Sequence, residues 1–365
     1  MNRTPQIRVC IVAPSVDAVG GQAVQAQRLR TRLASKPELE VNFVPINPRL
    51  VQPLHVLQRV KYIRTFVTSI AYAISLLRSV PRMELVHAFS ASYWSFLLAP
   101  VPAMLLARLF RKRIILNYRS GEADDHLTRW RTAAPLMRLA HLIVVPSGYL
   151  VEIFARHGLK SKVVPNFVEI DELPYRKRDI LRPVFLSNRS FQAHYNVSCV
   201  LRAFGRVQAR MPEARLIVAG DGPLRERLQE EARDLGLRSV MFCGAVAHDR
   251  MAALYDEADV FLNAPDIDNM PNSILEAAAC GLPIVSSNAG GIPYIVQHEV
   301  TALLTPCGDD VALAAAATRL FEEPGLATRL AAAARAEILE RYTWPVVEAE
   351  WVSTYRDIAR GEAQA

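Results

Sequence analysis

Short apolar runs alternate with longer segments of helical periodicity along most of the chain. The apolar runs are residues 7–14, 39–46, 84–89, 113–118 and 141–145 in the first half, and 184–187, 215–219, 240–243, 260–263, 283–286 and 302–304 in the second. Strands that alternate with helices form parallel sheets with helices on both faces. The pattern therefore predicts an α/β protein with two doubly wound parallel sheets.

The length of 365 residues suits two domains of roughly 150 to 180 residues better than one core. The polar stretch 169–182 is the expected linker. We place an N-terminal Rossmann-like domain at 1–178 and a C-terminal one at 179–345. Val347, Trp351 and Tyr355 recur at four-residue spacing in the last segment. We expect 346–365 to be a helix that closes back toward the N-terminal domain.

The composition is that of a folded protein in a reducing compartment. Half of the residues (51%) are hydrophobic and 22% are charged, which excludes disordered and collagen-like chains. The five cysteines occur singly, which disfavours a disulfide framework and a zinc ribbon. The first residues lack the apolar stretch of a signal peptide. These features predict a cytoplasmic location.

Positive charge is concentrated in the first half of the chain. Residues 1–180 contain 26 Lys and Arg against 12 Asp and Glu, whereas residues 181–365 contain 17 against 24. Between Val41 and Gly121 the only acidic residue is Glu84. The basic residues of that stretch are Arg49, Arg59, Lys61, Arg64, Arg78, Arg82, Arg108, Arg111, Lys112, Arg113 and Arg119. Such a one-sided surface suits a polyanion or an anionic lipid.

The same stretch is also apolar, which favours lipid over nucleic acid. Apolar residues recur at helical spacing at Leu54, Leu57, Val60, Ile63, Val67, Ile70, Ile74 and Leu77, and residues 94–107 form a second apolar run. We expect neither run to reach the roughly 18 to 20 residues of a membrane span, so residues 49–113 are predicted to contact an anionic membrane surface peripherally. The alternative is that they pack on the domain's own sheet. No nucleic-acid-binding motif accompanies the charge, so no nucleic-acid partner is expected.

Two glycine pairs follow predicted strands. Gly20 and Gly21 precede a helix, so their backbone amides could approach a phosphate or a sugar. Gly220 and Gly222 form the second pair, but Arg225 stands where a dinucleotide fingerprint has its third glycine. This disfavours a nicotinamide dehydrogenase. The alternative for both pairs is a tight turn between strand and helix.

The most specific stretch of the chain reads APDIDNMPNSILEAAACGLPIV from residue 264. It places Asp268 in a loop and Glu276 on the helix that follows, eight positions later. Pro271 favours the start of that helix and Gly281 its end. Free amides around Asn272 and Ser273 could hold a diphosphate, and Glu276 could accept hydrogen bonds from ribose hydroxyls.

This stretch resembles the signature of the retaining family-4 glycosyltransferases, which have the GT-B fold. Their Glu-x7-Glu motif has a context like EGxxxxxxEAxAxGxPVV, and this chain reads DNMPNSILEAAACGLPIV. The resemblance extends to residues 144–154, 162–169, 188–197, 214–223 and 259–265. It implies two Rossmann-like domains that face a central cleft, and transfer of a sugar from a nucleotide diphosphate sugar.

The resemblance also implies roles for individual residues. Glu276 would hold the donor ribose, while Asp268 and the backbone after it, at Asn269 and Met270, would meet the sugar and the phosphates. The remaining donor-binding residues would be Gly20, Gly21, Arg189, Asn272 and Ser273, with Arg189 on the diphosphate. No protein nucleophile would be needed, because the acceptor hydroxyl attacks on the face of the leaving group.

The sequence departs from the family pattern at three places. The first motif acid is Asp268 instead of Glu, which is one methylene shorter. His194 and Tyr195 occupy the place of the usual diphosphate lysine, and no lysine follows Lys177. Arg119 stands where the family often has a histidine. We expect Arg119 to compensate for the missing lysine and assign Asp268 and Arg119 as the catalytic residues.

Metal and histidine chemistry are not expected. Asp266 and Asp268 match a DxD pattern, but the surrounding motif belongs to a metal-independent fold, so we expect neither a metal nor another cofactor. The isolated histidines are interpreted as structural residues, with His87 as the one candidate for the cleft.

The sequence thus predicts a retaining, metal-independent hexosyltransferase on the inner face of the cell membrane. Its acceptor would be a glycan or a lipid-linked glycan of envelope or exopolysaccharide biosynthesis. Two alternatives stay open, namely a sugar-nucleotide epimerase of the same fold and a catalytically weakened sugar-nucleotide-binding protein. A phosphorylase that uses pyridoxal phosphate is excluded, because no lysine for a Schiff base follows Lys177.

Overall fold

The computed structural model describes residues 6–15, 21–50 and 61–362. The chain forms two compact units: Met1–Val164 together with Glu348–Ala365, and Pro165–Val347. The boundary thus lies earlier than the expected linker, because residues 165–182 pack with the second unit. Arg178, for example, is buried there and donates to the carbonyl oxygens of Tyr255, Ala258 and Cys280.

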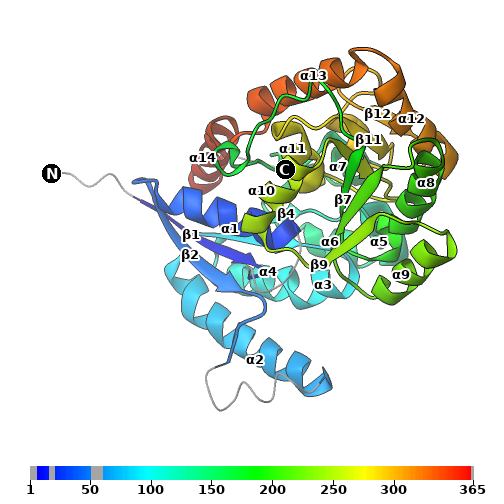
Figure 1. The fold of residues 1–365 in the computed structure, drawn as a ribbon. Coiled ribbons are helices and arrows are strands. Elements are labelled where there is room, and N and C mark those ends of the chain that lie inside the picture. The colour runs from blue at the N-terminus through cyan, green and yellow to red at the C-terminus, as the bar shows by residue number, and fades with distance from the viewer. Residues whose placement is uncertain (1–5, 16–20, 51–60, 363–365) are drawn as a thin grey trace. The chain divides into compact units, whose positions relative to one another are not determined.

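The first unit contains a sheet of six parallel strands in the order β2-β1-β3-β4-β5-β6. Figure 1 labels β1, β2 and β4 of this sheet. The strands are β1 (Ile7–Ala13), β2 (Leu39–Pro45), β3 (Leu85–Ser90), β4 (Arg113–Tyr118), β5 (Leu142–Val145) and β6 (Lys162–Val163). The described helices are α1 (Gly21–Ala34), α2 (Lys61–Ser79), α3 (Tyr93–Leu98), α4 (Pro100–Leu109), α5 (Ala123–Arg129), α6 (Ala133–Met137), α7 (Gly148–Arg156) and α14 (Trp344–Arg360), of which α14 begins in the second unit.

Successive side chains along each strand of the first unit point to opposite faces of the sheet, and both faces are buried. Val12, Val86 and Leu116 pack with α2, α4 and α7 in one core cluster. Strand residues of opposite parity, such as His87, face the last helix, where His87 contacts Trp351. Strands buried on both faces in this way are typical of parallel sheets.

The second unit repeats this plan with the order β12-β11-β10-β7-β8-β9, again all parallel. Its strands are β7 (Val184–Asn188), β8 (Arg215–Ala219), β9 (Val240–Gly244), β10 (Val260–Asn263), β11 (Ile284–Ser287) and β12 (Leu303–Thr305). Its α-helices are α8 (Val197–Arg210), α9 (Arg225–Asp234), α10 (His248–Glu257), α11 (Asn272–Ala279), α12 (Asp310–Glu322) and α13 (Leu326–Arg341). Phe185 packs with α8 and α12, and its neighbour Leu186 packs with α10 and α11.

The predicted class, with two doubly wound parallel sheets, is confirmed. Each of the eleven predicted strands is present with ends that agree to within one residue. The pattern missed β6, because only two residues of that strand pair with β5. Residues 348–365 belong to the first unit, so the last helix passes from the second unit into the first.

Helix α2 differs from the expectation for the basic, apolar stretch. It begins at Lys61, and the predicted positions Leu54, Leu57 and Val60 lie outside the described residues. The helical segment Ile63–Arg82 is long and apolar enough to cross a membrane by length and composition alone. The expectation that this run is too short to cross a membrane was therefore wrong.

Candidate functional site

The second sheet reverses its strand order between β7 and β10. These two strands are parallel neighbours, and the chain leaves them in opposite directions toward β8 and β11. Ligands of doubly wound sheets bind at the carboxyl ends of the strands, at such a reversal. Arg189 follows β7 directly, and Asp268 lies in the loop after β10. The fold thus brings together two candidate residues that are 79 positions apart.

Arg189 and Asp268 form an ion pair, and only 9% and 12% of their side chains are exposed. A second guanidinium nitrogen of Arg189, Nη1, donates to Ser273 Oγ at 3.2 Å. The guanidinium carbon lies 3.9 Å from the centre of the Tyr195 ring. Asp268 also accepts a hydrogen bond from the amide of Asn269 at 2.8 Å. The arginine is therefore held in one orientation by a carboxylate, a hydroxyl and an aromatic face.

Helix α11 begins beside this pair. Pro271 is its N-cap residue and provides no side-chain hydrogen bond to the first turn. A helix N-terminus carries partial positive charge from its unpaired amides. Ser273, which accepts from Arg189, lies in this first turn and is buried. The helix end and the guanidinium thus present positive charge in the same place.

Asn166 holds the turn that leads into α11. Its side-chain amide donates to the carbonyl oxygen of Met270 at 2.9 Å and to Asn272 Oδ1 at 2.8 Å. Its own backbone amide lies 3.2 Å from the Met270 sulfur. Sequence reasoning missed this residue, although it lies in the segment 162–169 that resembles the family.

Two glycines allow the site loops to approach neighbouring backbone. A Cβ atom on Gly220 would lie 1.9 Å from the carbonyl oxygen of Arg189. A Cβ atom on Gly291 would lie 2.0 Å from the carbonyl oxygen of Asn269. Both contacts are possible only without a side chain. This favours the turn interpretation for the Gly220 pair, since Gly220 packs against the backbone of Arg189.

Glu276 lies deeper in the same unit, on α11, and is 4% exposed. Its Oε2 accepts a hydrogen bond from the Tyr255 hydroxyl at 3.0 Å, and Asn188 Nδ2 donates to that hydroxyl at 3.1 Å. Burial, followed by the charge of Glu276, raises the pKa of Tyr255 well above its ordinary value. Tyr255 therefore stays a neutral donor that fixes the carboxylate. Neither Tyr255 nor Asn188 was among the residues predicted for the site.

The remaining predicted residues belong to the first unit. Arg119 follows β4 and donates from Nη1 to Asn117 Oδ1 at 3.2 Å, with its guanidinium over the Phe89 ring. Burial lowers the pKa of Arg119 to about 9. Gly21 is the first residue of α1, and the next residue, Gln22, donates to the carbonyl oxygen of Ser90 at 3.0 Å. Gly20 lies outside the described residues.

His87 continues the network of Arg119 into the interior. Asn117 Nδ2 lies 3.0 Å from His87 Nε2, and His87 Nδ1 lies 2.8 Å from the Tyr355 hydroxyl. Burial, followed by the charge of Arg119, lowers the pKa of His87 to about 3. The imidazole is thus neutral and satisfied on both sides. This supports a structural role for His87 over a place in the cleft.

The DxD carboxylates have separate partners. Asp268 pairs with Arg189, whereas the exposed Asp266 accepts from Asn196 Nδ2 at 3.0 Å. Within the described part of the chain, no group of three His, Cys, Asp or Glu residues could hold a metal ion.

The family comparison matches a part of the second unit that includes this site. Residues 182–323 match the family model of the group 1 glycosyl transferases. This match includes Arg189, Asp268 and Glu276. The fold corresponds to known GT-B structures: the chain superimposes on Anabaena HepE in complex with UDP-glucose with a TM-score of 0.76 and 19% identity, over 96% of this chain and 100% of HepE.

Individual relatives are similar over part or most of the chain. The chain is 27% identical to the N-acetyl-alpha-D-glucosaminyl L-malate synthase of Bacillus anthracis over 213 residues, which is 55% of each protein. It is 27% identical over 280 residues to the GDP-mannose-dependent alpha-(1-6)-phosphatidylinositol monomannoside mannosyltransferase of Mycobacterium tuberculosis, over 74% of this chain and 68% of that enzyme. Together these matches show that the part of the chain that carries the site is similar to group 1 glycosyl transferases.

Proposed function

We propose that this protein is a glycosyltransferase that takes its sugar from a nucleotide diphosphate sugar held by the second unit. The observation that carries the proposal is the contact of Arg189 with Ser273 in the first turn of α11, with Glu276 buried on the same helix. These groups lie within the residues that match the group 1 glycosyl transferases. HepE, which has the same fold, was crystallised with UDP-glucose.

Different site residues bind different parts of the donor. The guanidinium of Arg189 and the N-terminus of α11 bind the diphosphate. Glu276 accepts hydrogen bonds from the ribose hydroxyls. A charge-assisted hydrogen bond contributes about 1.5 to 3 kcal/mol, and a helix terminus contributes about 0.3 to 1 kcal/mol. Both favour the departing nucleoside diphosphate, because its negative charge grows in the transition state.

The second unit contributes less positive charge than the family pattern implies. No lysine follows Lys177, and Asp268 neutralises Arg189. Asp268 therefore has two roles in our proposal: it orients the guanidinium of Arg189, and it contacts the donor sugar. We assign to Arg119 of the first unit the charge that the missing lysine would supply.

We further propose retention of anomeric configuration without a metal ion. In this mechanism the acceptor hydroxyl attacks on the face of the leaving group and gives its proton to a phosphate oxygen. Proton nuclear magnetic resonance of the product would show the same anomeric configuration as the donor. An inverted product would refute this step, and loss of activity with a chelator would refute metal independence.

We propose that the acceptor is a glycan or a lipid-linked glycan of envelope or exopolysaccharide biosynthesis, and that the protein works peripherally at the inner face of the cell membrane. The exposed apolar residues of α2 and the basic character of residues 49–113 support this location. The name of the mycobacterial relative includes phosphatidylinositol monomannoside, which is a lipid.

A sugar-nucleotide epimerase is less well supported, because the family match and both relatives' names describe transfer or synthesis. Incubation with a panel of sugar nucleotides and candidate acceptors tests these possibilities together. Transferase activity gives a glycosylated acceptor, whereas epimerised free donor would identify an epimerase. Binding with neither product would identify a catalytically weakened binding protein.

The donor is best identified by a thermal-shift screen with nucleoside diphosphates and their sugars. A ligand that binds only the folded state raises the melting temperature. We expect one nucleoside diphosphate to give the largest shift, and we expect this shift to become smaller in Glu276→Gln. No shift with any nucleotide would refute the proposed function.

A further inference from the structure

Helix α2 has two faces of different character. Tyr72 and Leu76 belong to the core of the first unit, and the Tyr72 hydroxyl donates to the carbonyl oxygen of Ala99 at 2.7 Å. Large apolar residues on the other face are exposed: Ile63, Phe66, Ile70, Ile74 and Leu77. Phe66 is 69% exposed. These five positions follow helical spacing, so they form one continuous apolar stripe.

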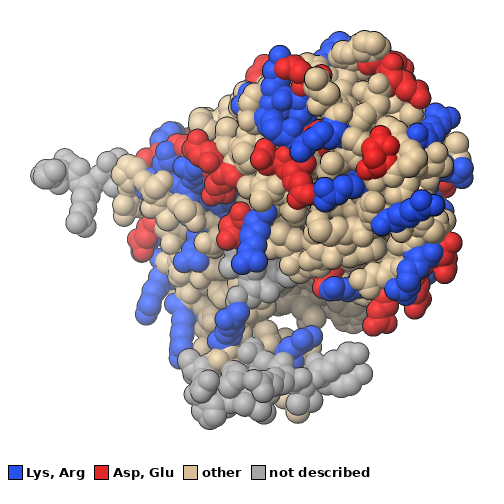
Figure 2. All heavy atoms as spheres, in the orientation of Figure 1, with Lys and Arg blue, Asp and Glu red and all other residues tan. Residues whose placement is uncertain are grey.

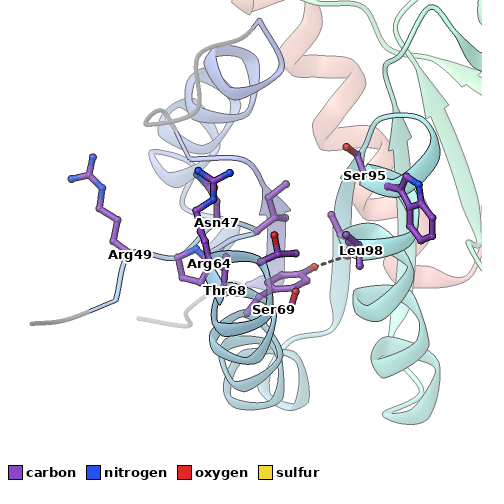
Figure 3. A pocket seen from close by; sticks show the side chains of 13 residues that line it. Asn47, Arg49, Arg64, Thr68, Ser69, Ser95 and Leu98 are labelled. Atoms are coloured by element: carbon purple, nitrogen blue, oxygen red, sulfur yellow. Dashed lines mark hydrogen bonds between the residues drawn. The ribbon is translucent and has the colours of Figure 1, made fainter. Parts of the chain in front are cut away.

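A pocket of about 700 Å³ opens between α2 and α3. Figure 3 shows Arg64, Thr68 and Ser69 on the α2 side and Ser95 and Leu98 on the α3 side. The dashed hydrogen bond in that view joins Tyr72 to Ala99 at the base of the pocket. Its volume is within the range of small-ligand sites, which is about 300 to 1,000 Å³.

The pocket combines cations, hydroxyls and an aromatic ring at its rim. Arg49 and Arg64 line it from the α2 side, and Trp94, which is 66% exposed, lines it from α3. Thr65, Thr68, Ser69 and Ser95 supply hydroxyl groups. A phosphate accepts hydrogen bonds from guanidinium and hydroxyl groups, and an exposed tryptophan suits the boundary between headgroups and acyl chains.

The surroundings of the pocket are cationic and apolar. Glu84 is the one carboxylate between Val41 and Gly121, and it pairs with Arg8. In the lower part of Figure 2, the described atoms that are visible around the grey region are mostly blue and tan. An anionic bilayer is complementary to both properties, since it offers negative headgroups and an apolar interior.

Helix α2 cannot both span a bilayer and keep its core contacts. Tyr72 and Leu76 pack one face of α2 into the core of the first unit. The polar residues Thr65, Thr68 and Ser69 lie on the same face of the helix. A spanning helix would carry this polar face and the attached sheet into hydrocarbon. The exposed stripe alone can enter the boundary of a bilayer while the rest of the unit stays outside.

We propose that this pocket binds the phosphate headgroup of an anionic membrane lipid while the α2 stripe inserts into the acyl boundary. The inference deepens the peripheral location proposed above and rests on it. Arg49 and Arg64 bind the phosphate, and the hydroxyls of Thr68 and Ser95 complete the site. Trp94 and Phe66 then contact the acyl chains on either side of the headgroup.

The test is co-sedimentation of the full chain with vesicles of phosphatidylglycerol and phosphatidylcholine, or of phosphatidylcholine alone, at low salt. We expect binding to the anionic vesicles only. An arginine near an anionic surface contributes about fivefold in affinity, so the double variant Arg49→Gln and Arg64→Gln should bind about 25-fold more weakly. The matched control removes two exposed arginines of α9 (Arg227→Gln and Arg233→Gln) and should bind like the unmodified protein.

Tryptophan fluorescence gives a readout that does not depend on charge. Trp94 is the most exposed tryptophan of the chain, so anionic vesicles should shift its emission to shorter wavelength. This shift should disappear in Trp94→Phe and shrink in Phe66→Ser, both of which change exposed side chains. Free glycerol 3-phosphate should leave vesicle binding unchanged, since it lacks the acyl chains; displacement by it would identify a free phosphate ester as the ligand and overturn the lipid assignment.

The experiments test the pocket, the peripheral location and the binding of the donor separately. Equal binding to neutral vesicles would overturn the choice of an anionic lipid, and binding to duplex DNA in place of vesicles would overturn the peripheral location. Anionic binding that is unaffected by Arg49→Gln with Arg64→Gln would overturn the pocket alone. The nucleotide thermal shift is measured on the same variants, so loss of donor binding is detected separately, and circular dichroism confirms that each variant is folded.

Discussion

Arg189 is paired with Asp268 in the structure, so the arginine expected to bind the diphosphate already has an anionic partner. The pair lies where the order of the second sheet reverses, beside the first turn of α11. A diphosphate that enters this site must share the guanidinium with a carboxylate. In the proposed function, the charge of this pair therefore decides how tightly the diphosphate is held.

We predict that Asp268→Asn separates binding from transfer. Removal of the carboxylate frees Arg189 for the phosphates, so affinity for the nucleoside diphosphate should rise about tenfold, or about 1.4 kcal/mol. Turnover should fall about 100-fold, since Asp268 also contacts the sugar in our proposal. Calorimetry and product assays measure the two effects. Asp266→Asn is the matched control, because Asp266 is exposed and bonds to Asn196. Weaker diphosphate binding by Asp268→Asn would contradict the shared-guanidinium explanation.

We predict that Glu276→Gln weakens nucleoside diphosphate binding about tenfold and leaves inorganic pyrophosphate binding unchanged. In our proposal the carboxylate accepts hydrogen bonds from ribose hydroxyls, which pyrophosphate lacks, and a charged acceptor contributes about 1.5 to 3 kcal/mol. The glutamine can still accept from Tyr255, so folding should be retained. Glu257→Gln, at an exposed ion pair with Arg215, is the control. An equal loss for both ligands would place Glu276 near the diphosphate instead.

Much of this site was predictable because its residues are ordered along short local motifs. The apolar runs locate the strands, and the stretch after residue 264 locates Asp268, the start of α11 and Glu276. The sequence does not show which side chains form contacts with each other when they are far apart along the chain. Sequence reasoning therefore assigns Arg189 to the phosphates. No residue near Arg189 in the sequence indicates that its guanidinium pairs with Asp268.

Contacts over long separations were missed for the same reason. Asn166 holds Met270 across 104 positions, and Tyr255 holds Glu276 from a different helix. Neither residue belongs to a motif of charged or glycine residues. Similarly, the pattern of α2 shows an apolar stripe, but only the structure shows that Ile63, Ile70 and Ile74 face away from the core.

We predict that Arg119→Ala lowers turnover about 100-fold and that Arg119→Lys restores part of it. In our proposal Arg119 supplies the charge that stabilises the departing diphosphate, and a lysine keeps the charge without the planar geometry. Arg129→Ala is the matched control, because this arginine lies in the same unit and is 72% exposed. Unchanged turnover in a folded Arg119→Ala protein would refute the compensation.

We predict that Gly291→Ala abolishes donor binding by displacing the loop of Asp268. The new methyl group would lie 2.0 Å from the carbonyl oxygen of Asn269, so one of the two backbones must move. A loss of about 1 to 3 kcal/mol of stability should accompany the loss of the nucleotide thermal shift. Gly205→Ala, within α8, is the control, since its nearest contact is the flexible end of Leu237 at 3.2 Å. A nucleotide shift that persists in Gly291→Ala would show that this close approach is not required.

We predict that His87 makes the protein less stable in mild acid. Burial lowers the pKa of His87 to about 3, whereas an unfolded histidine titrates near 6.5. Between these values the unfolded state binds more protons, so this contribution is complete above pH 6.5 and is lost as the pH falls toward 3. From pH 7 to pH 5 the loss is about 2 kcal/mol. Urea unfolding at both pH values should therefore show a difference that shrinks by this amount in His87→Asn. The exposed His298→Asn should keep the full difference. An unchanged pH dependence in His87→Asn would mean that other groups cause the acid sensitivity.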